Sequence, residues 1–172
     1  MVAWWLRAVS LFNVLVVIAW VAWAWPRSAW LAIGGVLLFM VAGRLWLGLQ
    51  FWIMQTFKQR LGMPHATREA VLQAWNAETR DALHQFAWQI PWREWEVPDH
   101  VPADAQGQGG VVLVHGWMCN RAVWTQTMRH LRAQNIPCIA VSLPMLLYGI
   151  ETARPVVDAA VRRLHQATGV AP

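Results

Sequence analysis

The fold class of this chain is decided by one short stretch, Val111-Val112-Leu113-Val114-His115-Gly116. Its four apolar residues follow a glycine pair and are mostly β-branched, which is typical of a parallel strand buried on both faces. The strand ends in His115-Gly116, where a glycine lets the backbone turn sharply beside a ligand. We therefore predict a central strand that leads directly into a tight functional turn.

A second strand and two helices are predicted after this turn. The strand is expected at residues 137–143, and the second helix at residues 152–168, with Pro155 tolerated in its first turn and Gly169 as its C-cap. Because strands alternate with helices, the sheet should be parallel. The apolar residues expected to form the helix faces that pack on the sheet are Trp124, Met128 and Leu131 in the first helix, and Val157, Val161 and Leu164 in the second.

The N-terminal part of the chain holds two long uncharged stretches. Residues 8–26 carry no charge and are about as long as the ~20 residues that an apolar helix needs to cross a bilayer. A second uncharged run at residues 29–43 extends to Leu49 or beyond if Arg44 reaches toward the surface. Residues 25–28 then form a tight hairpin. Tryptophans gather near the predicted ends, as in an interfacial aromatic belt: Trp4, Trp5, Trp20, Trp23, Trp25, Trp30, Trp46 and Trp52.

The composition favours a membrane protein and excludes a nucleic-acid-binding protein. Of the 172 residues, 57% are hydrophobic and 14 are Trp, which is too apolar for an ordinary soluble domain. The net charge of +5 is dispersed, because residues 1–57 contribute +3 and residues 58–172 contribute +2 from 11 basic and 9 acidic side chains. No concentrated basic face is therefore expected, and the lipid bilayer is the predicted partner.

The basic residues near the span ends predict the orientation. A single arginine lies in the hairpin, whereas the other charges lie before the first span or after the second, so the positive-inside rule places both termini in the cytoplasm. We predict a multi-pass protein of the inner (cytoplasmic) membrane whose α/β part is cytoplasmic. The charges used are Arg7 before the first span, Arg27 in the hairpin, and Arg44, Lys58 and Arg60 after the second.

Residues 58–109 are predicted to connect the anchor to the fold. Thr67 is a suitable N-cap for an amphipathic helix, which Pro91 should end. The polar face of that helix is mixed in charge, so packing on the α/β part is favoured over lying on the membrane surface. Residues 92–97 alternate like an edge strand, and a polar loop follows.

The residues around the turn resemble a known family. Val114-His115-Gly116-Trp117, followed by Cys119-Asn120-Arg121 and Trp124, is similar to the oxyanion-hole strand and loop of bacterial lipase/esterase-type α/β-hydrolases. The two-span anchor resembles membrane-bound members of that superfamily. The resemblance implies that the backbone N–H of Trp117 helps to hold the oxyanion of the tetrahedral intermediate, while His115 and Gly116 shape the turn. It also implies an acyl ester as the substrate of the full-length form.

The same resemblance implies a catalytic Ser, Asp/Glu and His further along the chain, with the Ser in a G-x-S-x-G elbow. Ser10, Ser28 and Ser142 are the serines of this sequence, and none lies between such glycines. The predicted organisation is a two-span membrane anchor at 1–57, a connector at 58–109 and the N-terminal portion of an α/β-hydrolase fold at 110–172. The chain is expected to stop before the elbow and to be inactive alone.

No catalytic residue, metal site or cofactor site is predicted in this chain. No His/Cys/Asp cluster has metal-ligand spacing, and no glycine motif cradles a phosphate. Cys119 and Cys138 are too few for a disulfide framework and are expected to be free. Pairing Cys119 with His115 gives no cysteine nucleophile, because no third group orients the imidazole.

A non-enzymatic membrane protein is the alternative function. Two parallel strands leave an unpaired sheet edge, and such an edge favours pairing with another chain. In this interpretation the partial α/β domain serves protein interaction.

Overall fold

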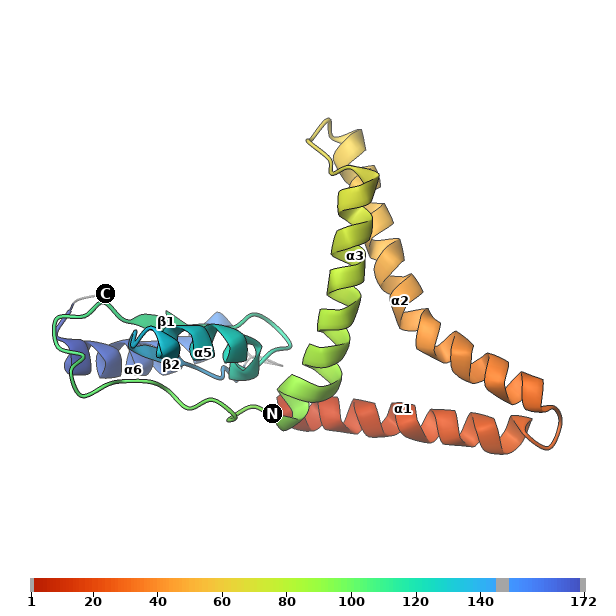
Figure 1. Cartoon of the computed structure of the whole chain (residues 1–172), viewed down its shortest axis with the longest axis horizontal. Coiled ribbons are helices and arrows are strands. Elements are labelled where there is room, and N and C mark those ends of the chain that lie inside the picture. The colour runs from red at the N-terminus through yellow and green to blue at the C-terminus, as the bar shows by residue number, and fades with distance from the viewer. Residues whose placement is uncertain (1, 145–148, 171–172) are drawn as a thin grey trace. The chain divides into compact units, whose positions relative to one another are not determined.

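The computed structural model describes residues 2–144 and 149–170 and divides the chain into two compact units (Figure 1). The helical unit comprises Ala8–His84, and the α/β unit comprises Met1–Arg7 together with Gln85–Pro172.

Helices α1 (Val2–Ala24) and α2 (Ala29–Arg60) are both long and apolar enough to cross a membrane. The hairpin between them lies at residues 25–28, as predicted, and Ser28 caps α2 by accepting a hydrogen bond from the N–H of Leu31 at 3.4 Å. In the most apolar 18-residue stretch of each helix, only 17% of the residues of α1 and 6% of those of α2 are buried. The core helix of a soluble domain would be buried on several sides, so these exposures agree with the predicted apolar anchor.

Helix α3 (Arg68–Leu83) packs against α2 within the helical unit. Its predicted N-cap is confirmed, because Thr67 Oγ1 accepts from the N–H of Ala70 at 3.2 Å. That this helix also packs on the α/β part stays a prediction. Trp75 lies flat on Gly48, where a Cβ atom would stand 3.2 Å from the indole ring, so the missing side chain creates the docking place for α3.

The chain remains helical after α3, through the π-helix η1 (His84–Gln89) and α4 (Ile90–Trp92). The helical segment ends at Trp92, one residue after Pro91, so the predicted end is close to the observed one.

The edge strand predicted at residues 92–97 is wrong, because Trp92 ends α4 and residues 94–97 form a turn. The N–H of Glu96 donates to the carbonyl of Arg93 at 3.2 Å, and the Glu96 carboxylate pairs with Arg93 at 3.2 Å and with Arg129 at 2.6 Å. These contacts stabilise the turn over the extended form that local alternation suggested.

The α/β unit contains strands β1 (Val111–Leu113) and β2 (Cys138–Ala140), which pair in parallel as predicted. Val112 lies opposite Ile139 in the register. The second strand is shorter than the predicted 137–143, because β1 ends at Leu113 and offers no further partner residues. On the other edge of β2, Cys138 and His100 exchange two antiparallel hydrogen bonds of 2.9 and 2.7 Å. Strand β2 is thus paired on both edges, and β1 on one edge within the described residues.

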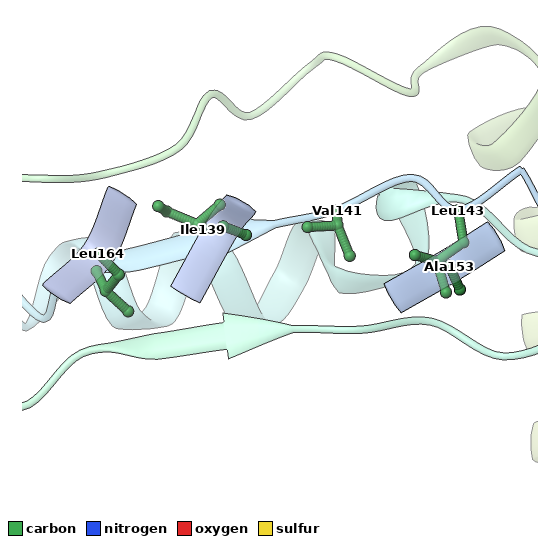
Figure 2. Packing of buried hydrophobic residues seen from close by; sticks show 6 residues of the cluster. Ile139, Val141, Leu143, Ala153 and Leu164 are labelled. Carbon is green, nitrogen blue, oxygen red and sulfur yellow. The ribbon is translucent and has the colours of Figure 1, made fainter. Parts of the chain in front are cut away.

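Two helices cover the small sheet: α5 (Thr125–Ala133), which follows the short 3-10 helix η2 (Arg121–Trp124), and α6 (Ile150–Thr168). Successive residues of β2 point to opposite faces. Ile139 joins Leu164 of α6 in one cluster (Figure 2), and Ala140 joins Met128 of α5 in another. The predicted faces agree for Trp124, Met128, Leu131, Val157 and Leu164.

Helix α6 begins two residues before the predicted start, at Ile150. Gly149 precedes it, and the Gly149 carbonyl accepts from both the N–H and the hydroxyl of Thr152, at 3.1 and 2.7 Å. Pro155 consequently stands beyond the first turn, inside the helix. The predicted C-cap is confirmed, because Gly169 has a left-handed φ of 70°.

The adjacent glycines 109 and 110 provide a matched test of this packing. A Cβ atom on Gly110 would lie 2.8 Å from the side chain of Leu164, which is buried against the sheet, whereas a Cβ on Gly109 would meet nothing within 4 Å. We expect Gly110→Ala to lower the free energy of unfolding by about 1–3 kcal/mol through overpacking, and Gly109→Ala to leave it nearly unchanged. Urea unfolding of the detergent-solubilised chain measures both, and equal effects would contradict the packing described.

Candidate functional site

The turn after β1 begins with a buried histidine. His115 is 5% exposed, and its Nε2 accepts a hydrogen bond from the N–H of Leu143 at 2.8 Å. A nitrogen that accepts carries no proton, so the ring proton is on Nδ1 and is donated to the carbonyl of Gly116, also at 2.8 Å. His115 is therefore a neutral imidazole that joins the end of β1 to the chain after β2.

The far end of the turn is held by a second bond to the same segment. The N–H of Arg121 donates to Ser142 Oγ at 3.2 Å, and the Ser142 hydroxyl donates to Glu94 Oε1 at 2.7 Å. Residues 115–121 are thus attached at both ends to Ser142 and Leu143, which follow β2 directly.

Between these two attachments the turn is open. Gly116 and Trp117 are exposed, Trp117 to 69%, and a Cβ atom placed on Gly116 would meet nothing within 4 Å. Met118 adopts a left-handed φ of 62°, a conformation that residues other than glycine seldom adopt. The turn therefore combines buried, hydrogen-bonded ends with an accessible and locally strained centre.

Asn120 and Arg121 belong to the site in a way that sequence reasoning missed. Asn120 caps η2 by accepting from the N–H of Ala122 at 3.0 Å, and its amide donates to the carbonyl of Ile90 at 2.9 Å. An Asn immediately before a helix is a common N-cap, and this signal could have identified its role. Arg121 is 3% exposed, although an arginine is seldom buried unless it is paired.

The partner of Arg121 is Asp99, at 2.9 Å. Arg121 also donates to the carbonyl of Val97 at 2.9 Å and lies 4.5 Å over the ring of Trp95. Asp99 in turn accepts from Arg163 of α6 at 2.9 Å and from the N–H of Ala140 in β2 at 3.2 Å. Nothing in the sequence marks Asp99 for this role, because its partners lie 22 and 64 residues away.

The two thiols near the turn are not activated by their surroundings. Burial raises the pKa of the Cys119 thiol and of the Cys138 thiol, so both remain protonated at neutral pH. Both cysteines are free. The Ser142 hydroxyl donates to a carboxylate, and His115 is committed to Leu143. Across residues 2–144 and 149–170, no group of three His, Cys, Asp or Glu side chains could hold a metal ion.

Comparison of the chain with models of protein families, with curated proteins and with solved structures returns no match.

His115→Leu tests the attachment at the start of the turn. The substitution leaves the buried N–H of Leu143 without an acceptor, so we expect a loss of about 1–3 kcal/mol in the free energy of unfolding. His115→Gln provides the control, because its side-chain oxygen can accept in place of Nε2. Urea unfolding should show a smaller loss for His115→Gln, and the same loss in both variants would argue against an acceptor role.

Proposed function

We propose that residues 110–172 supply the oxyanion-hole part of a lipase/esterase-like α/β-hydrolase that α1 and α2 hold at a membrane. The observation that carries this proposal is the turn at 115–121, which is attached at both ends and open at its centre. Donors that stabilise an oxyanion must be held in place before charge develops on the substrate. A turn attached in this way meets that requirement.

Within the turn we assign the oxyanion donor to the backbone N–H of Trp117. His115 and Gly116 position it, through the Leu143 bond and the Nδ1–H bond to the Gly116 carbonyl. An acyl ester is the proposed substrate class. The nucleophile, acid and base are not assigned in this chain, because none of its serines lies in a G-x-S-x-G elbow.

We propose further that α1 and α2 span the inner membrane, with the α/β unit on the cytoplasmic side. Contacts inside the α/β unit support a two-span arrangement, because Val2 and Leu6 at the start of α1 pack with Ile90 and Ala122. A helical hairpin that crosses a membrane twice returns the chain to its starting side. The residues at the start of α1 and the residues after α2 then lie on the same side of the membrane. The contacts of Val2 and Leu6 with Ile90 and Ala122 require this arrangement.

Arg7 strengthens the same junction. Its Nε donates to the carbonyl of Pro91 at 2.7 Å, and its guanidinium lies 5.0 Å from the ring centre of Trp4 and 4.8 Å from that of Trp92. An arginine stacked between two tryptophans suits the headgroup layer of a membrane, where aromatic and cationic side chains gather.

Protein interaction through β1 is the second candidate function. Strand β1 is paired with β2 alone in the described part of the chain, and Val112 directs its N–H and carbonyl to the other edge, since its neighbours Val111 and Leu113 bond to the β2 side. This edge accepts a further strand in either function. Esterase activity of a product that also carries a G-x-S-x-G elbow distinguishes the two.

The hydrolase proposal is tested by comparing residues 1–172 with any longer product that carries a G-x-S-x-G elbow after them, using a fluorophosphonate probe and a short-chain aryl ester. We expect residues 1–172 alone to remain unlabelled, and the longer product to react. Trp117→Pro removes the proposed N–H donor and should lower kcat about 10²–10³-fold, whereas Trp117→Phe keeps the N–H and most of the activity. Labelling of residues 1–172 that Ser142→Ala abolishes, or an inert longer product, would contradict the proposal.

Membrane insertion is tested by alkaline carbonate extraction. We expect the chain to stay in the membrane fraction, because α1 and α2 expose apolar side chains along most of their length. A reporter fused after Pro172 should be active on the cytoplasmic side only. Release into the soluble fraction would overturn the two-span assignment, and a reporter active outside the cytoplasm would overturn the orientation.

A further inference from the structure

The helical unit contains a cavity of about 910 Å³ between α2 and α3. This volume lies in the range of sites that hold small molecules. Trp75 attaches the two helices beside the cavity, since its Nε1 donates to the carbonyl of Arg44 at 3.0 Å and its ring lies on Gly48. The guanidinium of Arg44 covers the ring at 4.3 Å and bonds to Asn76 of α3. The cavity therefore lies at an ordered junction of two helices.

The lining of the cavity changes character along the helices. Toward Gly48 it is apolar, with Leu49, Leu72 and Trp75. Toward the loop between α2 and α3 it is polar, with Gln55 of α2 and with His65 and Arg68 around the start of α3. None of the lining residues is Asp or Glu, so the polar end carries positive charge without a carboxylate to neutralise it.

One polar atom at this end has no partner in the protein. Gln55 Oε1 is buried and accepts no hydrogen bond. Because this oxygen has almost no accessible surface, it belongs to the polar end of the lining but offers no contact to a ligand. The N-terminus of α3 adds the positive end of a helix dipole beside Arg68.

The length of α2 sets the depth of the cavity in a membrane. Its 32 residues span about 48 Å, whereas the hydrocarbon core is about 30 Å thick. If α2 enters the core at Ala29, it leaves after about 20 residues, close to Leu49. Gln55 and Arg68 then lie at the level of the lipid headgroups, and Leu49 lies at the hydrocarbon boundary.

We infer that this cavity binds one anionic glycerophospholipid, such as phosphatidylglycerol. The acyl chains pack against Leu49, Leu72 and Trp75. The phosphate lies near Arg68 and His65. The site rests on the proposed insertion of α2 and is independent of any hydrolase chemistry.

Native mass spectrometry of the detergent-solubilised full chain, with equal amounts of phosphatidylglycerol and phosphatidylcholine, tests the inference. We expect phosphatidylglycerol to be retained several-fold more than phosphatidylcholine. Arg68→Gln should reduce that preference to about one. Arg80→Gln should keep it, because Arg80 is an exposed arginine of the same helix outside the cavity.

A second variant addresses the polar end directly. Gln55→Glu keeps the shape of the side chain but adds a negative charge, so we expect it to reduce retention of phosphatidylglycerol and to leave phosphatidylcholine unaffected. Thermal unfolding of each variant confirms that the fold is retained.

Three results would overturn the inference: equal retention of both lipids, an unchanged preference in Arg68→Gln, or displacement of the lipid by inorganic phosphate, which would make free phosphate the ligand. Carbonate extraction measures insertion separately. A chain that stays in the membrane without lipid preference therefore contradicts this site and leaves the anchor intact.

Discussion

The buried charge of Arg121 is the constraint on which the α/β unit depends. An unpaired guanidinium in a protein interior is costly, so the fold must bring a carboxylate to it. Asp99 meets this need and at the same time bonds to β2, through the N–H of Ala140, and to Arg163 of α6. One carboxylate thus joins the start of η2, the central strand and the last helix, although Arg163 is largely exposed and its pair contributes little stability by itself.

The same constraint shapes the proposed oxyanion turn. Because the side chain of Arg121 is held by Asp99, its backbone N–H is directed to Ser142, and the turn that begins at His115 has a fixed end. The strain at Met118 is tolerated between two fixed ends. Rigid ends and an accessible centre are what stabilisation of a developing charge requires. Only the first residues of α1, among them Val2 and Leu6, pack within this unit.

Much of the fold could be predicted from local sequence. The β-branched run at 111–114 and the apolar run at 137–143 indicated two parallel strands, because only a strand covered on both faces is apolar throughout. Thr67 and Gly169 marked helix ends through their intrinsic capping preferences. The wrong prediction at 92–97 concerns a place where distant residues decide. The alternation there gives way to ion pairs of Glu96, one of which reaches Arg129. Helix α3 packs on α2 at a place where Gly48 leaves room for an indole.

The sequence by itself therefore determined the classes of structure: two apolar helices of membrane-spanning length, a parallel strand pair, and a turn at His115 and Gly116 placed after a buried strand. These follow from hydrophobic period and from backbone preferences, which act over a few residues. Only the tertiary structure decided which side chains hold the turn. Asp99 and Ser142 are unremarkable in the sequence, and they matter because the fold places them against a buried guanidinium and a backbone N–H. A buried polar group needs a hydrogen-bond partner, and these groups become buried only when distant segments pack together.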